Sequence, residues 1–355
     1  MSEDERLIAD QLEGIPAPQD STFLIGHEEE AARFASSYRS GRMHHAWLLS
    51  GPKGIGKATF SFHAARHILA NPDPATAPEN FQPEEWPEPL VRQVMQGGHP
   101  DLLHLTRPWD DKTKKFKSQL SVDEIRKTQA FYSMTAGAGG WRITIVDAAD
   151  DMNASAANAL LKILEEPPKR SVFFVITHAA GGLLPTIRSL CQMTGLSPVS
   201  EQQVVETITK LAPDLPKPMI EESAKLSSGS VRRGLKLAQS DVLDQFGLYS
   251  NTMASRAVGG AKDWEAAHKI SDALSKKGSE EDYQLFLELV QGWIAKQVRS
   301  EAGQISNAAL ASWAEVWEKA NQSIRMADTF NLDKKQVILT FFRLLFERNQ
   351  TLPVA

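Results

Sequence analysis

Apolar runs alternate with amphipathic segments over the first half of the chain, which is the pattern of an α/β fold. Continuous apolar runs predict strands buried on both faces of a parallel sheet at residues 45–51, 141–147 and 171–177. Helical patterns follow two of them, at residues 56–70 and 152–166. In the second helix one face carries Ala157, Leu160, Leu161 and Leu164. We expect a doubly wound α/β domain, 1–198, with its ligands at the carboxyl ends of the strands.

From about residue 199 the chain has helical patterns alone. Residues 199–242 predict a small helical unit, with a serine cap at Ser200 and two short helices around Gly229. Residues 243–355 predict longer helices with three apolar stripes. The stripes are Tyr283, Phe286, Leu287, Val290 and Ile294; Trp313, Val316, Trp317, Ala320 and Ile324; and Ile338, Phe341, Leu344 and Leu345. We interpret these rows as the core of a helical bundle rather than as a cofactor site.

Composition narrows the function classes. Hydrophobic residues make up 42% and charged residues 23%, and the net charge of -5 disfavours a generally basic nucleic-acid binder. The run at 112–117, with four lysines, is interpreted as a solvated loop. The single cysteine, Cys191, excludes an internal disulfide and a multi-cysteine zinc site. No apolar stretch is long enough for a membrane span, and the acidic start is no secretion signal, so we expect a cytoplasmic protein.

The stretch GPKGIGKATF, residues 51–60, has the spacing of a phosphate-binding loop between a strand and a helix. Gly51, Gly54 and Gly56 would let backbone N–H groups surround phosphates, and Lys57 would reach the terminal phosphates. Such loops place serine or threonine directly after the lysine as a magnesium ligand, but here the residue is Ala58. The hydroxyl of Thr59 is displaced by about 100° around the helix, so the sequence predicts impaired metal binding.

An acidic residue ends the strand predicted at 141–147. Asp147 stands where it would help to hold a metal ion, but its neighbour is Ala148, where an ATPase needs a carboxylate to polarise the attacking water. Asp150 and Asp151 are interpreted as caps of the next helix rather than as substitutes for that carboxylate. Ser121, in a capping box, and Asn153 begin predicted helices and could approach DNA, although capping alone explains both residues.

Taken together, several segments resemble the delta-prime family of AAA+ clamp-loader subunits of bacterial DNA polymerase III. They are GRMHHAWLLSGPKGIGK, ITIVDAADDMNASAANALLKILEEPP, LLPTIRSLCQ and GSVRRGLKLA. The resemblance implies an AAA+ P-loop module, a small helical lid and a C-terminal helical collar that assembles a heteropentameric ring. It also implies partners: motor subunits, a delta subunit, the sliding clamp, and primer-template DNA through the complex.

The resemblance also implies roles for particular residues. The degenerate nucleotide site would comprise Gly51, Gly54, Gly56, Lys57, Thr59, Asp147, Thr177 as the polar sensor and Arg232 as the lid arginine. The family carries an arginine that reaches a neighbour's ATP where this chain has Leu190, so either that contribution is lost or Arg188 partly replaces it. The family's four-cysteine zinc module is absent, and no zinc is expected.

Two function hypotheses follow. In the first, the chain is a non-hydrolysing stator subunit that contributes to DNA replication by assembling with its partners. In the second, it is an ATP-hydrolysing motor subunit that binds its metal through water. The joint loss of the hydroxyl at Ala58 and the carboxylate at Ala148 favours the first hypothesis. Nucleotide binding stays open: the glycines and Lys57 allow weak, magnesium-independent binding of ATP or ADP, and an empty architectural loop is the alternative.

Overall fold

The computed structural model describes residues 8–134, 140–253, 259–301, 307–330 and 332–351. The acidic start of the chain lies partly outside these residues. The chain divides into two compact units, Met1–Leu235 and Lys236–Ala355, and the division falls within one helix. The three-domain boundaries at 198/199 and 242/243 stay predictions.

The first unit is built on a five-stranded parallel sheet with the order β2-β5-β6-β1-β7. Its strands are β1 (Ala46–Ser50), β2 (Leu102–Leu105), β5 (Arg142–Val146), β6 (Ser171–Thr177) and β7 (Gln192–Gly195). The three central strands correspond to the apolar runs, and β5 and β6 are buried along their whole length. The expected parallel sheet is therefore confirmed, whereas the edge strands β2 and β7 were not predicted, because each has only four residues and β7 is largely polar.

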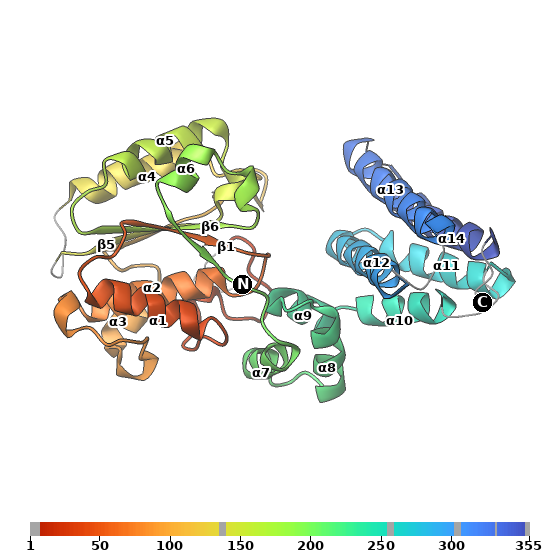
Figure 1. The fold of residues 1–355 in the computed structure, drawn as a ribbon, viewed down its shortest axis with the longest axis horizontal. Coiled ribbons are helices and arrows are strands. Elements are labelled where there is room, and N and C mark those ends of the chain that lie inside the picture. Colours follow the sequence, from red (N-terminus) through yellow and green to blue (C-terminus); the bar gives the residue numbers. More distant parts are fainter. Residues whose placement is uncertain (1–7, 135–139, 254–258, 302–306, 331, 352–355) are drawn as a thin grey trace. The chain divides into compact units, whose positions relative to one another are not determined.

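Helices cover both faces of this sheet (Figure 1). On one face lie α1 (Glu28–Arg39), α2 (Lys57–Ala70) and α3 (Glu88–Met95). On the other lie α4 (Val122–Ser133), α5 (Ala154–Glu165) and α6 (Pro185–Ser189). Each face has its own apolar cluster, one centred on Phe34, Phe60 and Phe174 and the other on Leu160, Phe173 and Val175. The doubly wound α/β class is thus confirmed.

Several local expectations need correction. Residues 112–117 are not simply a loop, because β3 (Trp109–Asp110) and β4 (Lys115–Phe116) form a hairpin. Its two aromatic rings lie 5.1 Å apart and hold the strands together. Ser121 precedes α4, but its side chain makes no capping bond, and the side chain of Glu124, the other capping-box residue, pairs with Lys127 at 2.6 Å. The proline-rich stretch between α2 and α3, residues 71–87, contains short 3₁₀ turns at Pro74–Thr76 and Pro83–Glu85.

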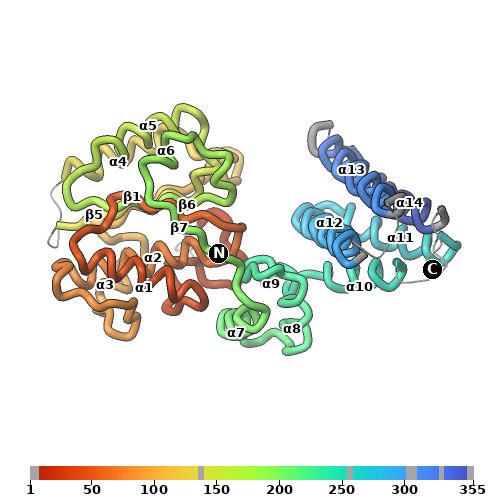
Figure 2. The backbone as a smooth tube through the Cα atoms, in the orientation of Figure 1, coloured from red at the N-terminus to blue at the C-terminus, as the bar shows by residue number. Residues whose placement is uncertain are grey.

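Beyond β7 the trace enters three helices, which can be followed in Figure 2: α7 (Glu201–Leu211), α8 (Lys217–Leu226) and α9 (Val231–Ala238). The predicted serine cap is confirmed, because the side chain of Ser200 accepts a hydrogen bond from the backbone N–H of Gln203. The two short helices around Gly229 are also confirmed. Their apolar cluster includes Ile208, Ile220 and Leu235, and Ile15 from the start of the chain joins it.

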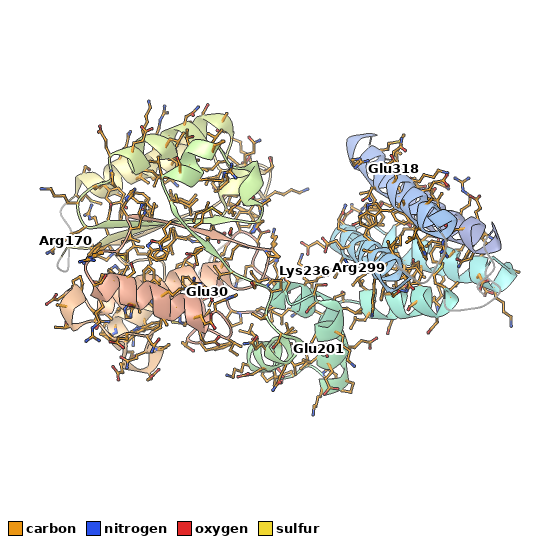
Figure 3. The ribbon with its side chains drawn as sticks, viewed as in Figure 1. Glu30, Arg170, Glu201, Lys236, Arg299 and Glu318 are labelled. Carbon is orange, nitrogen blue, oxygen red and sulfur yellow. The ribbon has the colours of Figure 1, made fainter. Side chains whose placement is uncertain are left out.

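The second unit consists of helices: α10 (Val242–Met253), α11 (Ala261–Leu274), α12 (Glu280–Glu301), α13 (Asn307–Phe330) and α14 (Lys334–Thr351). The stripes predicted on α12 and α14 are buried throughout. The stripe on α13 is correct for Trp313, Val316 and Ala320, but Trp317 is 39% exposed. One helical residue turns the chain by about 100°, which carries Trp317 away from the line through Val316 and Ala320. The side chains that fill both units are drawn in Figure 3.

Candidate nucleotide site

The glycine loop lies where the sequence predicts, between the end of β1 and the start of α2. Gly51, Gly54 and Gly56 have φ values of 150°, 79° and 104°. These angles favour glycine, and space requires it as well. A Cβ on Gly54 would lie 2.4 Å from the Cβ of Arg232, and one on Gly51 would lie 2.3 Å from the carbonyl oxygen of Leu196. The glycines therefore allow other backbone segments to approach the loop closely.

Lys57 is buried and is bound to the loop itself. Its Nζ donates to the carbonyl oxygens of Gly51 and Pro52, both at 2.6 Å. Burial lowers the pKa of Lys57 to about 8, against the opposing effect of Asp147 and Asp150. In this arrangement the ammonium group satisfies loop carbonyls rather than pointing freely toward a ligand.

Three further loop carbonyls are held by segments distant in the sequence. The carbonyl of Lys53 accepts from the hydroxyl of Ser230 at 2.8 Å, and that of Gly54 accepts from the backbone N–H of Arg232 at 3.1 Å. The carbonyl of Ile55 lies 2.8 Å from Nε2 of His27. The start of α9 therefore rests directly on the loop. Ser230 and His27 were not predicted, because nothing in the local sequence shows that they meet residues 53–55.

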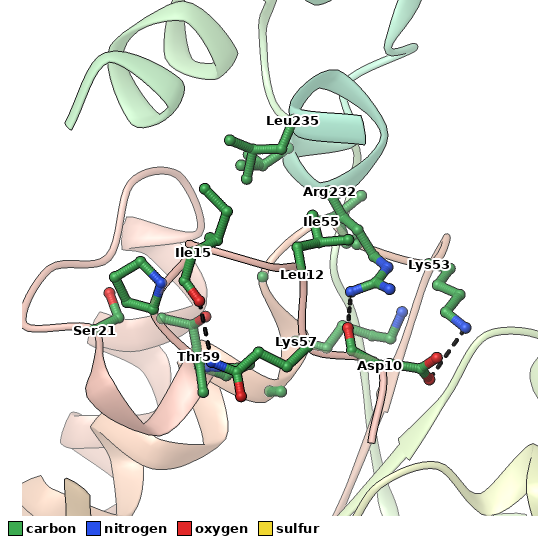
Figure 4. A pocket seen from close by; sticks show the side chains of 18 of the residues that line it. Asp10, Leu12, Ile15, Ser21, Lys53, Ile55, Lys57, Thr59, Arg232 and Leu235 are labelled. Atoms are coloured by element: carbon green, nitrogen blue, oxygen red, sulfur yellow. Dashed lines mark hydrogen bonds and ion pairs between the residues drawn. The ribbon is translucent and has the colours of Figure 1, made fainter. Parts of the chain in front are cut away.

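A cavity of about 210 Å³ lies beside the loop (Figure 4). Its walls include the loop from Lys53 to Gly56 and the first residues of α2, Lys57 to Thr59. Asp147, His178 and Arg232 also line it, together with a segment from Ala9 to Ile25 near the start of the chain. Thus Ala58 and Thr59 both line the cavity, although helix geometry places their side chains about 100° apart around α2.

Of the two residues that follow β5, Asp147 and Ala148, only Asp147 is among the residues that line this cavity. The Oδ2 atom of Asp147 lies 3.7 Å from Nε2 of His104. Ala148 is buried and offers only a methyl group. No group of three histidine, cysteine, aspartate or glutamate side chains suited to a metal ion occurs in the described part of the chain.

Thr177 and Asp150 form a separate cluster at the end of β6. The Thr177 hydroxyl donates to Asp150 at 3.0 Å, and the same carboxylate accepts from the backbone N–H groups of His178 and Ala179 at 2.7 and 3.1 Å. Asp150 is therefore no helix cap, and the prediction for it was wrong. Asn153 caps α5 instead, accepting from the backbone N–H of Ala156 at 2.9 Å. Thr177 is fully buried and does not line the cavity.

Asp151 is also no helix cap. Its carboxylate forms an ion pair with Arg107 at 3.1 Å. Burial raises the pKa of Asp151, although the charge of Arg107 opposes that effect. The carboxylate is therefore occupied by an arginine next to the cavity rather than by the N-terminus of a helix.

Arg232 faces the beginning of the chain. Its guanidinium donates to the backbone carbonyl of Asp10, as Figure 4 shows, and the carboxylate of Asp10 lies 3.2 Å from Lys53 and 3.0 Å from Arg107. Burial raises the pKa of Asp10, but the charges of Lys53, Arg107 and Arg232 outweigh it and keep the pKa below its usual value. Asp10 was missed by the sequence analysis, since no local motif marks it.

Arg188 lies in α6 and not among the residues that line the cavity. It is half-buried, and its Nε makes no hydrogen bond within the described chain. Leu190, at the position of the family's arginine, packs against the apolar cluster of the α5 face. The structure thus brings together the loop, Lys57, Thr59, Asp147 and Arg232, and leaves Thr177 and Arg188 apart from them.

Comparison with known proteins covers the core of this site. Residues 26–200 match the family described as DNA polymerase III, delta subunit. The DNA polymerase III subunit delta' of Pseudomonas aeruginosa is 33% identical over 201 residues, which are 57% of this chain and 58% of that protein. The subunit delta' of Escherichia coli is 31% identical over 210 residues, 59% of each chain. Residues 26–200 are therefore similar in sequence to delta-prime subunits of DNA polymerase III.

The chain spans less than two thirds of the length of these delta-prime relatives. The matched region contains the glycine loop, Asp147 and Arg188, whereas Asp10 and Arg232 lie outside it. Among solved structures, a gamma-subunit-related protein of Thermotoga maritima aligns at 18% identity with a TM-score of 0.42, over 90% of this chain and 98% of that chain. No described helix is both long and apolar enough to cross a membrane.

Proposed function

We propose that this protein is a non-hydrolysing stator subunit of a bacterial replicative clamp loader. In this role it assembles with motor subunits and a delta subunit into a heteropentamer that places the sliding clamp on primer-template DNA. The similarity of residues 26–200 to delta-prime subunits supports the role. DNA replication would also place the protein in the cytoplasm.

The observation that carries the proposal is the pair Ala58 and Ala148. Ala58 lines the cavity directly after Lys57, where a magnesium-binding hydroxyl is needed, and Ala148 is buried beside Asp147, where a general base is needed. Losing a positioned general base alone typically costs about 10²- to 10⁴-fold in rate. Loss of the metal ligand removes charge neutralisation at the transferred phosphate as well. The two defects remove different contributions to the same hydrolytic step, so neither remaining group can replace what the other position lacks.

Nucleotide binding, in this proposal, is weak and independent of magnesium. The cavity offers Lys53, Lys57 and Arg232 as cations for phosphates. However, Lys57 would have to leave the carbonyls of Gly51 and Pro52, and its desolvated ammonium is bound there by two short hydrogen bonds. That exchange reduces the net gain from binding ATP or ADP.

A motor subunit is the second candidate function, because Thr59 and Asp147 both line the cavity. A hydroxyl and a carboxylate could hold magnesium through bridging water. This candidate still lacks the general base next to Asp147. Arg188 is proposed, in either case, as a residue that contributes to a neighbouring subunit's site, since it does not face the cavity of its own chain.

The test compares hydrolysis and assembly. We expect the purified chain to show no ATP turnover above buffer with magnesium present, alone or with the delta subunit. We also expect complexes reconstituted with Lys57→Ala to assemble and load clamps as the unmodified protein does. The matched control is replacement of the equivalent lysine in the motor subunits, which should abolish loading. Turnover by the isolated chain that disappears in Lys57→Ala would establish the motor role instead.

A further inference from the structure

The cavity beside the glycine loop contains an anion supplied by the chain itself. Asp10 reaches it from the first segment of the protein, and its carboxylate pairs with Lys53 at 3.2 Å (Figure 4). The same carboxylate pairs with Arg107 at 3.0 Å. Its backbone carbonyl accepts from the guanidinium of Arg232. One residue thus engages a loop cation, the α9 arginine and a third cation next to the cavity.

These cations are the groups that a polyphosphate would need. Lys53 and Arg232 line the cavity, and both carry donors suited to phosphate oxygens. A phosphate chain entering here would compete with the Asp10 carboxylate for Lys53 and with the Asp10 carbonyl for Arg232. It would also be repelled by the negative charge already present.

The segment that carries Asp10 is anchored well enough to hold it in place. Asp10 has a left-handed backbone, with φ of 63°, a conformation that aspartate tolerates better than most residues. The side chain of the next residue, Gln11, donates to the carbonyl of Ile15 at 3.2 Å, and Ile15 is buried in the apolar cluster of α7, α8 and α9. Apolar packing at Ile15 therefore fixes the position from which Asp10 reaches the cations.

We propose that the Asp10 segment is an internal plug of the nucleotide site, which occupies the polyphosphate-binding cations and keeps the loop closed to nucleotide. The inference rests on the proposed function, in which the site needs no bound nucleotide. It adds a specific cause of weak binding that is independent of Ala58 and Ala148. Removing the plug opens the site to phosphate chains without making it hydrolytic.

The experiment measures binding of inorganic tripolyphosphate, and of ATP in EDTA, by calorimetry on the full-length chain. Asp10→Ala and the nearly isosteric Asp10→Asn should bind tripolyphosphate about tenfold more tightly than the unmodified protein, because a competing charge next to Lys53 is removed. Asp111→Ala is the matched control. It removes the same charge from a side chain that is 88% exposed and that lies 3.9 Å from the ammonium of Lys114. It should leave binding unchanged.

The double variant Asp10→Ala with Lys53→Ala tests whether the gain in tripolyphosphate affinity depends on Lys53. If the plug acts on Lys53, the double variant loses most of the added affinity. Equal or undetectable binding by Asp10→Ala and the unmodified chain would overturn the proposal, as would a gain that Asp111→Ala reproduces. Hydrolysis is scored separately in magnesium, so tighter binding without turnover supports both proposals, whereas turnover in the unmodified chain contradicts only the stator role.

Discussion

The two faces of the parallel sheet are built differently, although each is covered by three helices. On the α5 face, the buried side of the helix is formed by Ala156, Ala157, Leu160 and Leu164, and its other side is polar and exposed. On the opposite face, α2 is buried at every position from Phe60 to Ile68. Among these buried residues are Arg66, His63 and His67, each with no exposed surface.

The difference arises from what lies over each helix. A second layer covers α2, made of the short turn Pro18–Asp20, α3 and the proline-rich stretch. Arg66 donates to the backbone carbonyls of Ser21 and Gln19 and lies 5.7 Å from the ring centre of Trp86. Burial lowers the pKa of Arg66 to about 10. A helix of mixed composition can therefore be a core helix where a covering segment satisfies the terminal nitrogens of Arg66, although the ring nitrogens of His67 make no hydrogen bond within the described residues.

The largest expected effect is a pH dependence confined to the α2 face. Burial lowers the pKa of both His63 and His67 to about 4, with the charge of Arg66 adding to the effect at His63. The unfolded chain binds these protons below about pH 6.5 and the folded chain does not, so stability is lost as the pH falls from about 6.5 to 4. The loss reaches about 3 kcal/mol for each histidine. Hydrogen exchange of α2 amides at pH 7.5, 6 and 5 measures it.

His67→Leu should flatten this pH dependence, because it removes one titrating group. The protection of α5 amides should change with pH only through unfolding of the whole unit. His268→Leu, at an exposed histidine of the second unit, is the control and should leave the slope for α2 unchanged. Equal protection of α2 amides across the whole pH range would contradict the difference between the two faces.

On the α5 face, we expect a substitution in the core to lower the free energy of unfolding through lost packing alone. Leu160→Ala removes a fully buried side chain and should cost about 2–5 kcal/mol, with no added pH dependence between pH 7.5 and 5. Leu161→Ala, one position along and only partly buried, should cost clearly less. Exchange of α5 amides at pH 7.5 compares the two variants. Similar losses for both would show that the stripe does not define the core.

The smallest expected effect is a difference in stability between two variants at the N-termini of helices on that same face. Asn153→Ala removes a capping bond and should cost about 1 kcal/mol, whereas Ser121→Ala removes no capping bond and should stay within about 0.5 kcal/mol. Urea unfolding followed by exchange in α4 and α5 measures both. A larger loss for Ser121→Ala would mean that its hydroxyl caps α4 in solution.

The sequence by itself determined the elements whose cause is local. The apolar runs of β1, β5 and β6, the stripe of α5 and the glycine loop before α2 all follow from residues close together in the chain, because periodicity and glycine spacing act within a few turns of backbone. The absence of a hydroxyl at Ala58, directly after Lys57, and of a carboxylate at Ala148 can likewise be read from the sequence alone.

Tertiary structure decided which distant residues meet. It directed Asp150 to Thr177 rather than to a helix cap, set Ser230 and Arg232 on the loop, and brought Asp10 beside Lys53. Each contact joins segments whose separation along the chain carries no periodic signal, and an ion pair or hydrogen bond forms wherever folding brings complementary groups together. For this reason the sequence predicted the outline of a nucleotide site, and only the fold revealed which groups already occupy it.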